Sequence, residues 1–318
     1  MPFQSEIIKQ EARKCGFDLC GIAPTKLLKL EKERFEKALA RNYHAKKTYL
    51  ERDINKRFDP ESLLKNCKSV IVCGFNYNMQ KPETIDKPLL VKKKLSPIKE
   101  YKISQFAQII DYHIFIKEKL EDMACGLQEK FGFFHYKTTV DSSSISEKAW
   151  AVEVGLGYYG KNGIIQTALG SFVFLGILLI DKEVDTYNEA NQNSCGDCCK
   201  CLTACPTKAI VAPYYVDCNQ CIASINVLKK ANSFTQIAKY GWIIGCDECQ
   251  NVCPNNLYAP INKEAVAMRL SFMENKNKIF YSLTAVSFDN YFKNTVIYPL
   301  KYEGLKVRLN DFITANQD

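Results

Sequence analysis

Apolar residues along the chain fall into short continuous runs that alternate with stretches of helical spacing. Residues 69–75, 133–140 and 171–180 are rich in β-branched and aromatic side chains, which predicts strands, the last of them buried. Apolar residues recur with helical periodicity over residues 103–127, and the first 17 residues predict an amphipathic helix. Together these patterns predict a mixed α/β domain over residues 1–182.

Two further regions differ from this first one. Residues 183–260 are rich in cysteine, and residues 261–318 are helical and aromatic in pattern. The longest apolar run, residues 172–180, is far shorter than the ~20 residues that a bilayer requires. The first residues lack a hydrophobic signal core and a twin-arginine pair. We therefore expect a cytoplasmic protein without a membrane segment.

A lysine run at residues 92–94 is followed by Ser96, Pro97 and Lys99. Such a run is most often a solvated loop, and phosphate contact is the alternative.

Ten of the 15 cysteines lie between Cys195 and Cys253. In a reducing compartment, cysteines gathered in this way indicate metal ligands more than disulfides. The first group has the spacing C-x2-C-x2-C-x3-C-P, which is the run of bacterial ferredoxins with two 4Fe–4S clusters. It comprises Cys195, Cys198, Cys201, Cys205 and Pro206.

A second group, Cys246, Cys249 and Cys253 before Pro254, lacks the middle cysteine of a full run, so Cys221 or Cys218 must complete it. Because the fourth cysteine of each run reaches the other cluster, we predict cluster one from Cys195, Cys198, Cys201 and Cys253. Cluster two would take Cys205, Cys221, Cys246 and Cys249, with Cys199 as an outward-pointing spare. Zinc bound by the two C-x2-C pairs, or structural thiols, are the alternatives, although zinc does not explain both Cys-Pro endings.

The composition, 47% hydrophobic and 25% charged, is typical of a globular protein with a substantial core. The formal charge is +8. Eight thiolates and two 2+ cluster cores would lower it to about +4. A mildly basic protein of this kind is compatible with a nucleic-acid partner but does not indicate one.

Asp141 follows the second predicted strand and precedes a predicted helix. Ser144 and Glu147 have the spacing of a capping box at the start of that helix. The carboxyl end of a strand is where sites in α/β proteins often lie, so Asp141 is a candidate catalytic residue. The alternative is that Asp141 is itself a helix-capping acid. A helix N-terminus favours the ionised carboxylate, whereas a proton donor needs a raised pKa.

Several segments resemble the epoxyqueuosine reductase family, in order along about residues 1–310. They are Tyr49-Leu-Glu-Arg52 with Arg57-Phe-Asp-Pro60, Asp111-Tyr-His113, Val140-Asp141 with Glu147, Gly155-Leu-Gly157 through Gly160-Lys161-Asn162, and Gly170-Ser171. The chain departs from the family pattern at Ser143 and Ser144, where the family has glycine and proline.

The resemblance implies an α/β, flavin-nitroreductase-like, cobalamin-binding catalytic domain (1–182), a ferredoxin-like module with two 4Fe–4S clusters (183–260) and a short helical tail (261–318). It implies reductive deoxygenation of epoxyqueuosine to queuosine at the tRNA wobble position. Electrons would pass through both clusters to cobalamin, and Asp141 would donate a proton. Burial beneath the corrin ring would supply the raised pKa. The expected partners are tRNA and a reduced flavodoxin- or ferredoxin-type donor, and we expect a monomer.

By the same resemblance Arg57, Asp141, Lys161 and Asn162 contact the cofactor. A surface salt bridge is the alternative for Arg57, and a plain turn is the alternative for Lys161 and Asn162. The segment 111–116 lacks the glycine of the cobalamin motif D-x-H-x-x-G, so a corrinoid would have no histidine below cobalt. His113 is then a helix core or capping residue.

Two other functions share part of this pattern. A reductive dehalogenase has the same cofactors, but the usual exported form carries a twin-arginine signal and uses a tyrosine donor. A ferredoxin-type electron carrier would have no substrate of its own and would bind no cobalamin.

Overall fold

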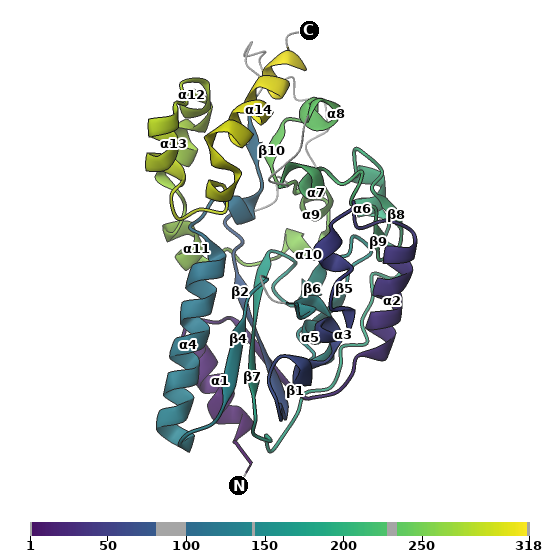
Figure 1. Cartoon of the computed structure of the whole chain (residues 1–318), viewed down its shortest axis with the longest axis vertical. Helices are drawn as coiled ribbons and strands as arrows, with labels where there is room; N and C mark the ends of the chain where they lie inside the picture. The colour runs from purple at the N-terminus through teal and green to yellow at the C-terminus, as the bar shows by residue number, and fades with distance from the viewer. Residues whose placement is uncertain (1, 81–99, 142–143, 228–233, 317–318) are drawn as a thin grey trace. The chain divides into compact units, whose positions relative to one another are not determined.

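The computed structural model describes residues 2–80, 100–141, 144–227 and 234–316. The lysine run at residues 92–94 lies outside the described residues. The chain forms two compact units, each assembled from separate stretches (Figure 1). The first unit is Met1–Asn76, Tyr112–Cys198 and Ala212–Tyr215, and the second is Tyr77–Asp111, Cys199–Val211 and Val216–Asp318. Each unit joins stretches from more than one of the three consecutive regions expected from the sequence.

A four-stranded antiparallel sheet forms the centre of the first unit, in the order β1-β2-β7-β4. Its strands are β1 (Leu19–Pro24), β2 (Ser69–Asn76), β7 (Val173–Ile180) and β4 (Tyr136–Thr139). β2 and β7 pair along their whole length, and every residue in both is buried. Strands buried on both faces read as continuous apolar runs, which is why the sequence identified them.

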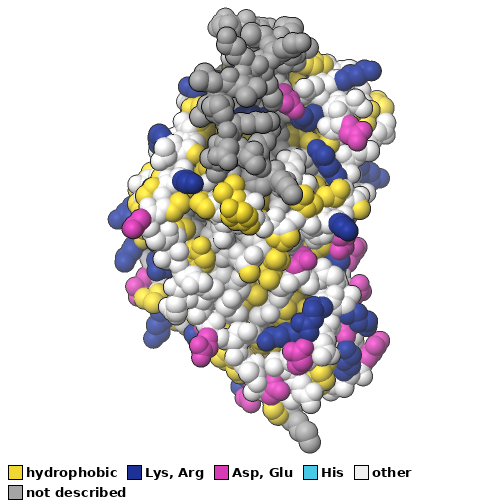
Figure 2. All heavy atoms as spheres, turned by 180° about the vertical axis from the view of Figure 1, so that it is seen from behind, with side chains coloured by type: hydrophobic (Ala, Val, Ile, Leu, Met, Phe, Trp, Pro, Cys, Tyr) yellow, Lys and Arg dark blue, Asp and Glu magenta, His cyan; other side chains and the backbone are white. Residues whose placement is uncertain are grey.

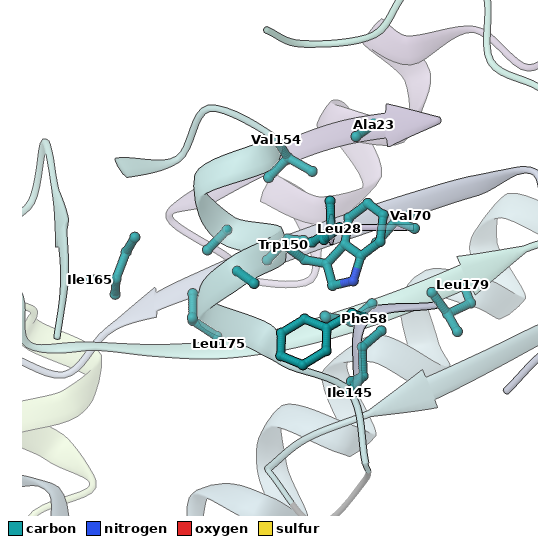
Figure 3. Close-up of a cluster of buried hydrophobic side chains, with 14 of the residues drawn as sticks. Ala23, Leu28, Phe58, Val70, Ile145, Trp150, Val154, Ile165, Leu175 and Leu179 are labelled. Carbon is teal, nitrogen blue, oxygen red and sulfur yellow. The ribbon is translucent and has the colours of Figure 1, made fainter. Parts of the chain in front are cut away.

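Helices cover the two faces of this sheet. On one face α4 (Tyr112–Phe131) packs so closely over Gly176 that a Cβ there would meet Ile116 and Leu120. On the other face α5 (Glu147–Glu153) buries Trp150 against alternate residues of β7, among them Leu175 and Leu179 (Figure 3). This core fixes the position of α5, which begins directly after the segment that carries Asp141.

The expected strands and helices are largely present. The strands expected at residues 69–75 and 171–180 are β2 and β7, and the expected N-terminal helix is α1 (Ser5–Lys14). The strand expected at 133–140 is present as β4, which covers only four of these residues.

The helix expected over residues 103–127 is wrong in its first part, because α4 starts at Tyr112. Residues 102–111 belong to the second unit, where the backbone N–H of Gln105 and the hydroxyl of Ser104 donate to Asp247. These contacts far along the chain override the local helical pattern.

The remaining elements of the first unit are short and lie around the sheet. They are α2 (Lys29–Ala40), α3 (Ile54–Phe58), the 3-10 helices Thr48–Leu50 and Pro60–Ser62, and the hairpin of β5 (Gly157–Tyr159) and β6 (Ile165–Thr167).

The second unit is built around a parallel pair, β3 (Lys102–Ile103) and β10 (Trp242–Ile244). Its main core is aromatic, and Tyr101, Phe272, Phe292 and Phe312 are buried in it. Residues 261–316 are helical, as expected: α11 (Lys263–Ala267), α12 (Lys276–Tyr281), α13 (Ala285–Phe292), α14 (Lys301–Thr314) and the 3-10 helices Ser271–Asn275 and Tyr298–Leu300.

Short elements carry the cysteine-rich stretch. They are α6 (Lys200–Ala204), α7 (Ile222–Asn226), α8 (Thr235–Ala238), α9 (Glu248–Asn251), α10 (Pro254–Leu257) and the hairpin of β8 (Ile210–Ala212) and β9 (Tyr215–Val216). The second unit also contains the 3-10 helix Gln105–Ala107, which lies earlier in the chain. Across the described ranges, no helix is both long and apolar enough to span a bilayer.

Candidate functional site

Asp141 lies two residues after the end of β4, beyond the buried Val140. Its backbone is left-handed, with φ of 43°. A residue with a Cβ rarely adopts this conformation, so contacts of Asp141 must hold it there. The side chain is 63% exposed. Asp141 therefore presents its carboxylate to solvent from a strained position at the end of a strand.

Two residues from the first turn of α4 contact this carboxylate. The Tyr112 hydroxyl donates to Asp141 Oδ2 at 2.9 Å, and His113 Nε2 lies 3.4 Å from the same oxygen. The Tyr112 ring is stacked between Phe174 of β7 and His113, with ring centroids 4.2 and 4.1 Å apart. The sheet thus holds Tyr112, and Tyr112 holds Asp141.

The same contacts set the acidity of Asp141. The hydrogen bond with His113 lowers its pKa below the usual aspartate range, and the Tyr112 hydroxyl lowers it further, while burial opposes both. In this conformation Asp141 is an ionised acceptor at neutral pH.

Glu147 also contacts Asp141, but not as the expected capping box. α5 begins at Glu147 itself, and its N-cap, Ser146, makes no side-chain capping bond. The expected box of Ser144 and Glu147 is therefore wrong. Glu147 Oε1 instead accepts the backbone N–H of Asp141 at 2.6 Å. Burial, with the charge of Asp141, raises the pKa of Glu147 to about 8. We name Asp141, Tyr112, His113 and Glu147 the Asp141 cluster.

Arg57 lies at the end of α3, and its backbone carbonyl accepts the N–H of Ser146, next to Glu147. Its guanidinium donates to the Tyr49 carbonyl at 2.8 Å and lies over the Phe35 ring. Desolvation lowers the pKa of Arg57. Its Nε is buried and, within the described ranges, has no hydrogen-bond partner. A buried orphaned donor of this kind needs an acceptor from elsewhere.

Lys161 and Asn162 form part of the turn between β5 and β6. Lys161 Nζ donates to the Gly196 carbonyl at 2.6 Å. Asn162 is buried, and its Oδ1 accepts the N–H of Ile164 at 3.2 Å. Both side chains therefore have partners within the first unit.

In the second unit, four of the predicted cluster cysteines lie in one small apolar group. Cys205 packs there with Ala209 and Ile210, and Cys201, Cys221 and Cys249 pack against them. Cys246 packs against the neighbouring group around Ile222 and Trp242. Cys221, and not Cys218, lies in the first group, together with Cys201 of predicted cluster one and with Cys205 and Cys249 of predicted cluster two.

Burial raises the pKa of the Cys221, Cys246 and Cys249 thiols, and the charge of neighbouring cysteines adds to the effect. Iron bound by these cysteines would displace the thiol protons, so metal binding would release protons. Cys253 also belongs to the second unit, whereas Cys195 and Cys198 belong to the first. Cys199 is exposed, as expected of a spare cysteine.

Reasoning from the sequence did not assign a role to Tyr112 and expected His113 to be a core or capping residue. The segment Asp111-Tyr-His113 was a signal for both, but only the fold brings α4 to the end of β4. Glu147 was identified as a helix cap, because its spacing from Ser144 fits that motif.

Eight cysteines in the ferredoxin pattern, carried by a chain with an antiparallel α/β sheet domain, define an iron–sulfur oxidoreductase. The family described as "4Fe-4S double cluster binding domain" matches residues 194–256, which favours iron–sulfur clusters over zinc. The family described as "Epoxyqueuosine reductase QueG, DUF1730" matches residues 57–142.

Relatives that match over nearly the whole chain point to the same family. Epoxyqueuosine reductase of Cyclobacterium marinum is 35% identical, over 95% of this chain and 94% of the relative. That of Leadbetterella byssophila is 37% identical, over 95% and 96%. The chain belongs to the epoxyqueuosine reductase family, and it is an enzyme, an oxidoreductase.

Solved structures show the same fold. A crystal structure of epoxyqueuosine reductase with a modified tRNA-Tyr stem loop has a TM-score of 0.82 at 23% identity, over 98% of this chain and 81% of that chain. Epoxyqueuosine reductase of Streptococcus thermophilus has a TM-score of 0.79 at 23% identity, with the same coverage.

Proposed function

We propose that this protein reductively deoxygenates epoxyqueuosine in tRNA to queuosine. The main support for this proposal is the exposed Asp141 carboxylate, which Tyr112 and His113 contact, in a chain of this family. The reaction breaks both carbon–oxygen bonds of the epoxide and forms a carbon–carbon double bond. It consumes two electrons and two protons, and the oxygen leaves as water.

Asp141 would supply a proton to the leaving oxygen. Its pKa is lowered while it contacts His113, so the carboxylate must gain a proton and release this contact before it donates. A loop that moves would allow this. A structure of the Bacillus subtilis enzyme is described as having its aspartate catalytic loop swung out of the active site. We propose that the Asp141 carboxylate likewise alternates between His113 and the substrate.

The family resemblance implies cobalamin, and the residues present fit it. Arg57 Nε is a buried donor without an acceptor among the described residues, and the corrin side chains carry amide carbonyls that accept such bonds. Lys161 and Asn162 would contact the tail through the turn that they form. Bound cobalamin would supply a low-potential metal that delivers electrons to the substrate carbon. Arg57 would orient the ring, and Asp141 would hold the proton for the leaving oxygen.

The two clusters would bring electrons to this site one at a time, from a reduced flavodoxin- or ferredoxin-type donor. Cluster one would use Cys195, Cys198, Cys201 and Cys253, and cluster two Cys205, Cys221, Cys246 and Cys249. Cys205, Cys221 and Cys249 of the second set pack in one group, which also contains Cys201 of the first set, so the packing brings ligands of both clusters close together.

tRNA as substrate rests on the family and on the relative solved with a tRNA stem loop. Figure 2 shows lysine and arginine side chains spread over one face of the molecule and mixed with acidic ones. With both clusters bound the formal charge of +8 would fall to about +4. A mildly basic protein of this kind would favour an anionic partner, and salt would weaken that binding.

The test is turnover of epoxyqueuosine tRNA by anaerobically reconstituted protein. Asp141→Ala and Asp141→Asn should lose about 10²-fold or more in single-turnover rate, because a general acid is worth that much. Iron and cobalt contents should stay unchanged. The matched control is Asp185→Asn, which changes another aspartate of the first unit, bound to the Ser5 N–H. A wild-type rate in the Asp141→Asn variant would refute the donor role. Absence of bound cobalamin in the wild type would favour an electron carrier.

A further inference from the structure

Within the Asp141 cluster, Glu147 has no role in the reaction proposed above. Tyr112 and His113 contact the Asp141 carboxylate. Glu147 binds the Asp141 backbone N–H instead, at 2.6 Å, from the first residue of α5. That backbone is left-handed, with φ of 43°. A left-handed aspartate costs about 1 kcal/mol or more, so it persists only where surrounding contacts enforce it.

We propose that Glu147 is a positioning residue for Asp141: its carboxyl holds the Asp141 N–H and thereby fixes the backbone turn that directs the Asp141 carboxylate to Tyr112. This rests on the proposed function, in which Asp141 donates the proton. The anchor is firm because α5 itself is fixed, with Trp150 buried in the core of the first unit (Figure 3).

The charge state of Glu147 makes this role dependent on pH. Burial raises its pKa to about 8, so Glu147 is protonated at neutral pH and accepts the N–H through its carbonyl oxygen. The charged groups that face it are Asp141, His113 on α4 and Lys148 on α5. Above its pKa a second negative charge would stand beside Asp141. That charge would oppose the negative charge that develops on the epoxide oxygen, so the rate should fall.

Two substitutions separate the hydrogen bond from the charge. Glutamine has the shape of neutral glutamic acid, so Glu147→Gln keeps the carbonyl acceptor and cannot ionise. Glu147→Ala removes the acceptor. Glu147→Ala should lower the single-turnover rate at saturating tRNA by about 10- to 100-fold, the usual effect of a misplaced catalytic group, with KM unchanged. Glu147→Gln should turn over like the wild type at pH 7. It should lack the decline in rate near pH 8 that is expected of the wild type.

The matched control is Glu153→Gln on the same helix. It removes a carboxylate that pairs with Lys26 at 2.5 Å and should leave the rate and its pH profile unchanged. A Glu147→Ala rate equal to the wild type would overturn the proposal. So would a Glu147→Gln variant as slow as Glu147→Ala, because the hydrogen bond would then not be the reason for the role.

Crystal structures of both Glu147 variants give a second measurement that needs no turnover. Asp141 should keep its left-handed backbone and its bond to Tyr112 in Glu147→Gln, and should lose both in Glu147→Ala. Retention of both in Glu147→Ala would overturn the positioning role. If the wild type did not turn over epoxyqueuosine tRNA, the proposed function would fail, and these structures would still decide the role of Glu147.

Discussion

The raised pKa of Glu147 makes the stability of the protein depend on pH in a direction opposite to that of most carboxylates. The pKa is about 8 in the folded protein and 4.5 without the fold. Between these values the unfolded chain has lost this proton and the folded chain still holds it. The contribution of Glu147 to the free energy of unfolding is therefore at its maximum below pH 4.5 and falls as the pH rises to about 8.

Glu147→Gln removes this dependence, because an amide does not titrate. From pH 5.5 to 8 the stability of the variant relative to the wild type should rise by at most about 3 kcal/mol, at about 1.4 kcal/mol per pH unit. Because the side chain is only partly buried, about 1–3 kcal/mol is expected. That corresponds to roughly 2–6 °C in Tm, at about 2 °C per kcal/mol for a chain of this size.

The assay is anaerobic thermal unfolding of reconstituted wild type, Glu147→Gln and Glu153→Gln at pH 5.5 and 8. The difference in Tm between Glu147→Gln and the wild type should grow with pH, while that for Glu153→Gln should stay constant. A Glu147→Gln difference that is the same at both pH values would show that Glu147 is ionised throughout and would refute the reasoning.

Three other variants test the expected cofactor sites. Cys249→Ser should reduce iron and acid-labile sulfide from about eight to about four per chain, whereas Cys199→Ser should leave both unchanged; bound zinc without sulfide would contradict the cluster assignment. Arg57→Ala should weaken cobalamin binding by about tenfold or more, the value of one hydrogen bond to a charged group. Its iron content should be that of the wild type, and unchanged cobalamin affinity, measured by titration, would remove Arg57 from the site.

Local patterns predicted those parts of the fold that depend on local chemistry. β2 and β7 were found because strands buried on both faces consist of continuous apolar residues. The family match at residues 194–256 confirms the iron–sulfur assignment, which depended on spacing within short segments. The individual ligands of each cluster stay predictions.

Features that depend on distant contacts could not be predicted in the same way. The helix expected from residue 103 starts at Tyr112, because Ser104 and Gln105 bind Asp247 instead. The resemblance pointed to Asp141, but the contact with Tyr112 requires the stack on Phe174. The capping box at Glu147 was wrong for the same reason: the N–H of Asp141 competes for its carboxyl.

The pairing of β3 with β10 sets an order of events during synthesis. About 140 residues separate Ile103 from Ile244, and ribosomes add about 5–20 residues per second. Lys102 and Ile103 therefore wait on the order of 10 s for their partner strand to leave the ribosome. Ser104 and Gln105 wait equally long for Asp247, which lies between Cys246 and Cys249. The second unit is thus completed only after its last cysteines are made. If Cys246, Cys249 and Cys253 are cluster ligands, as predicted, cluster insertion follows the synthesis of all three.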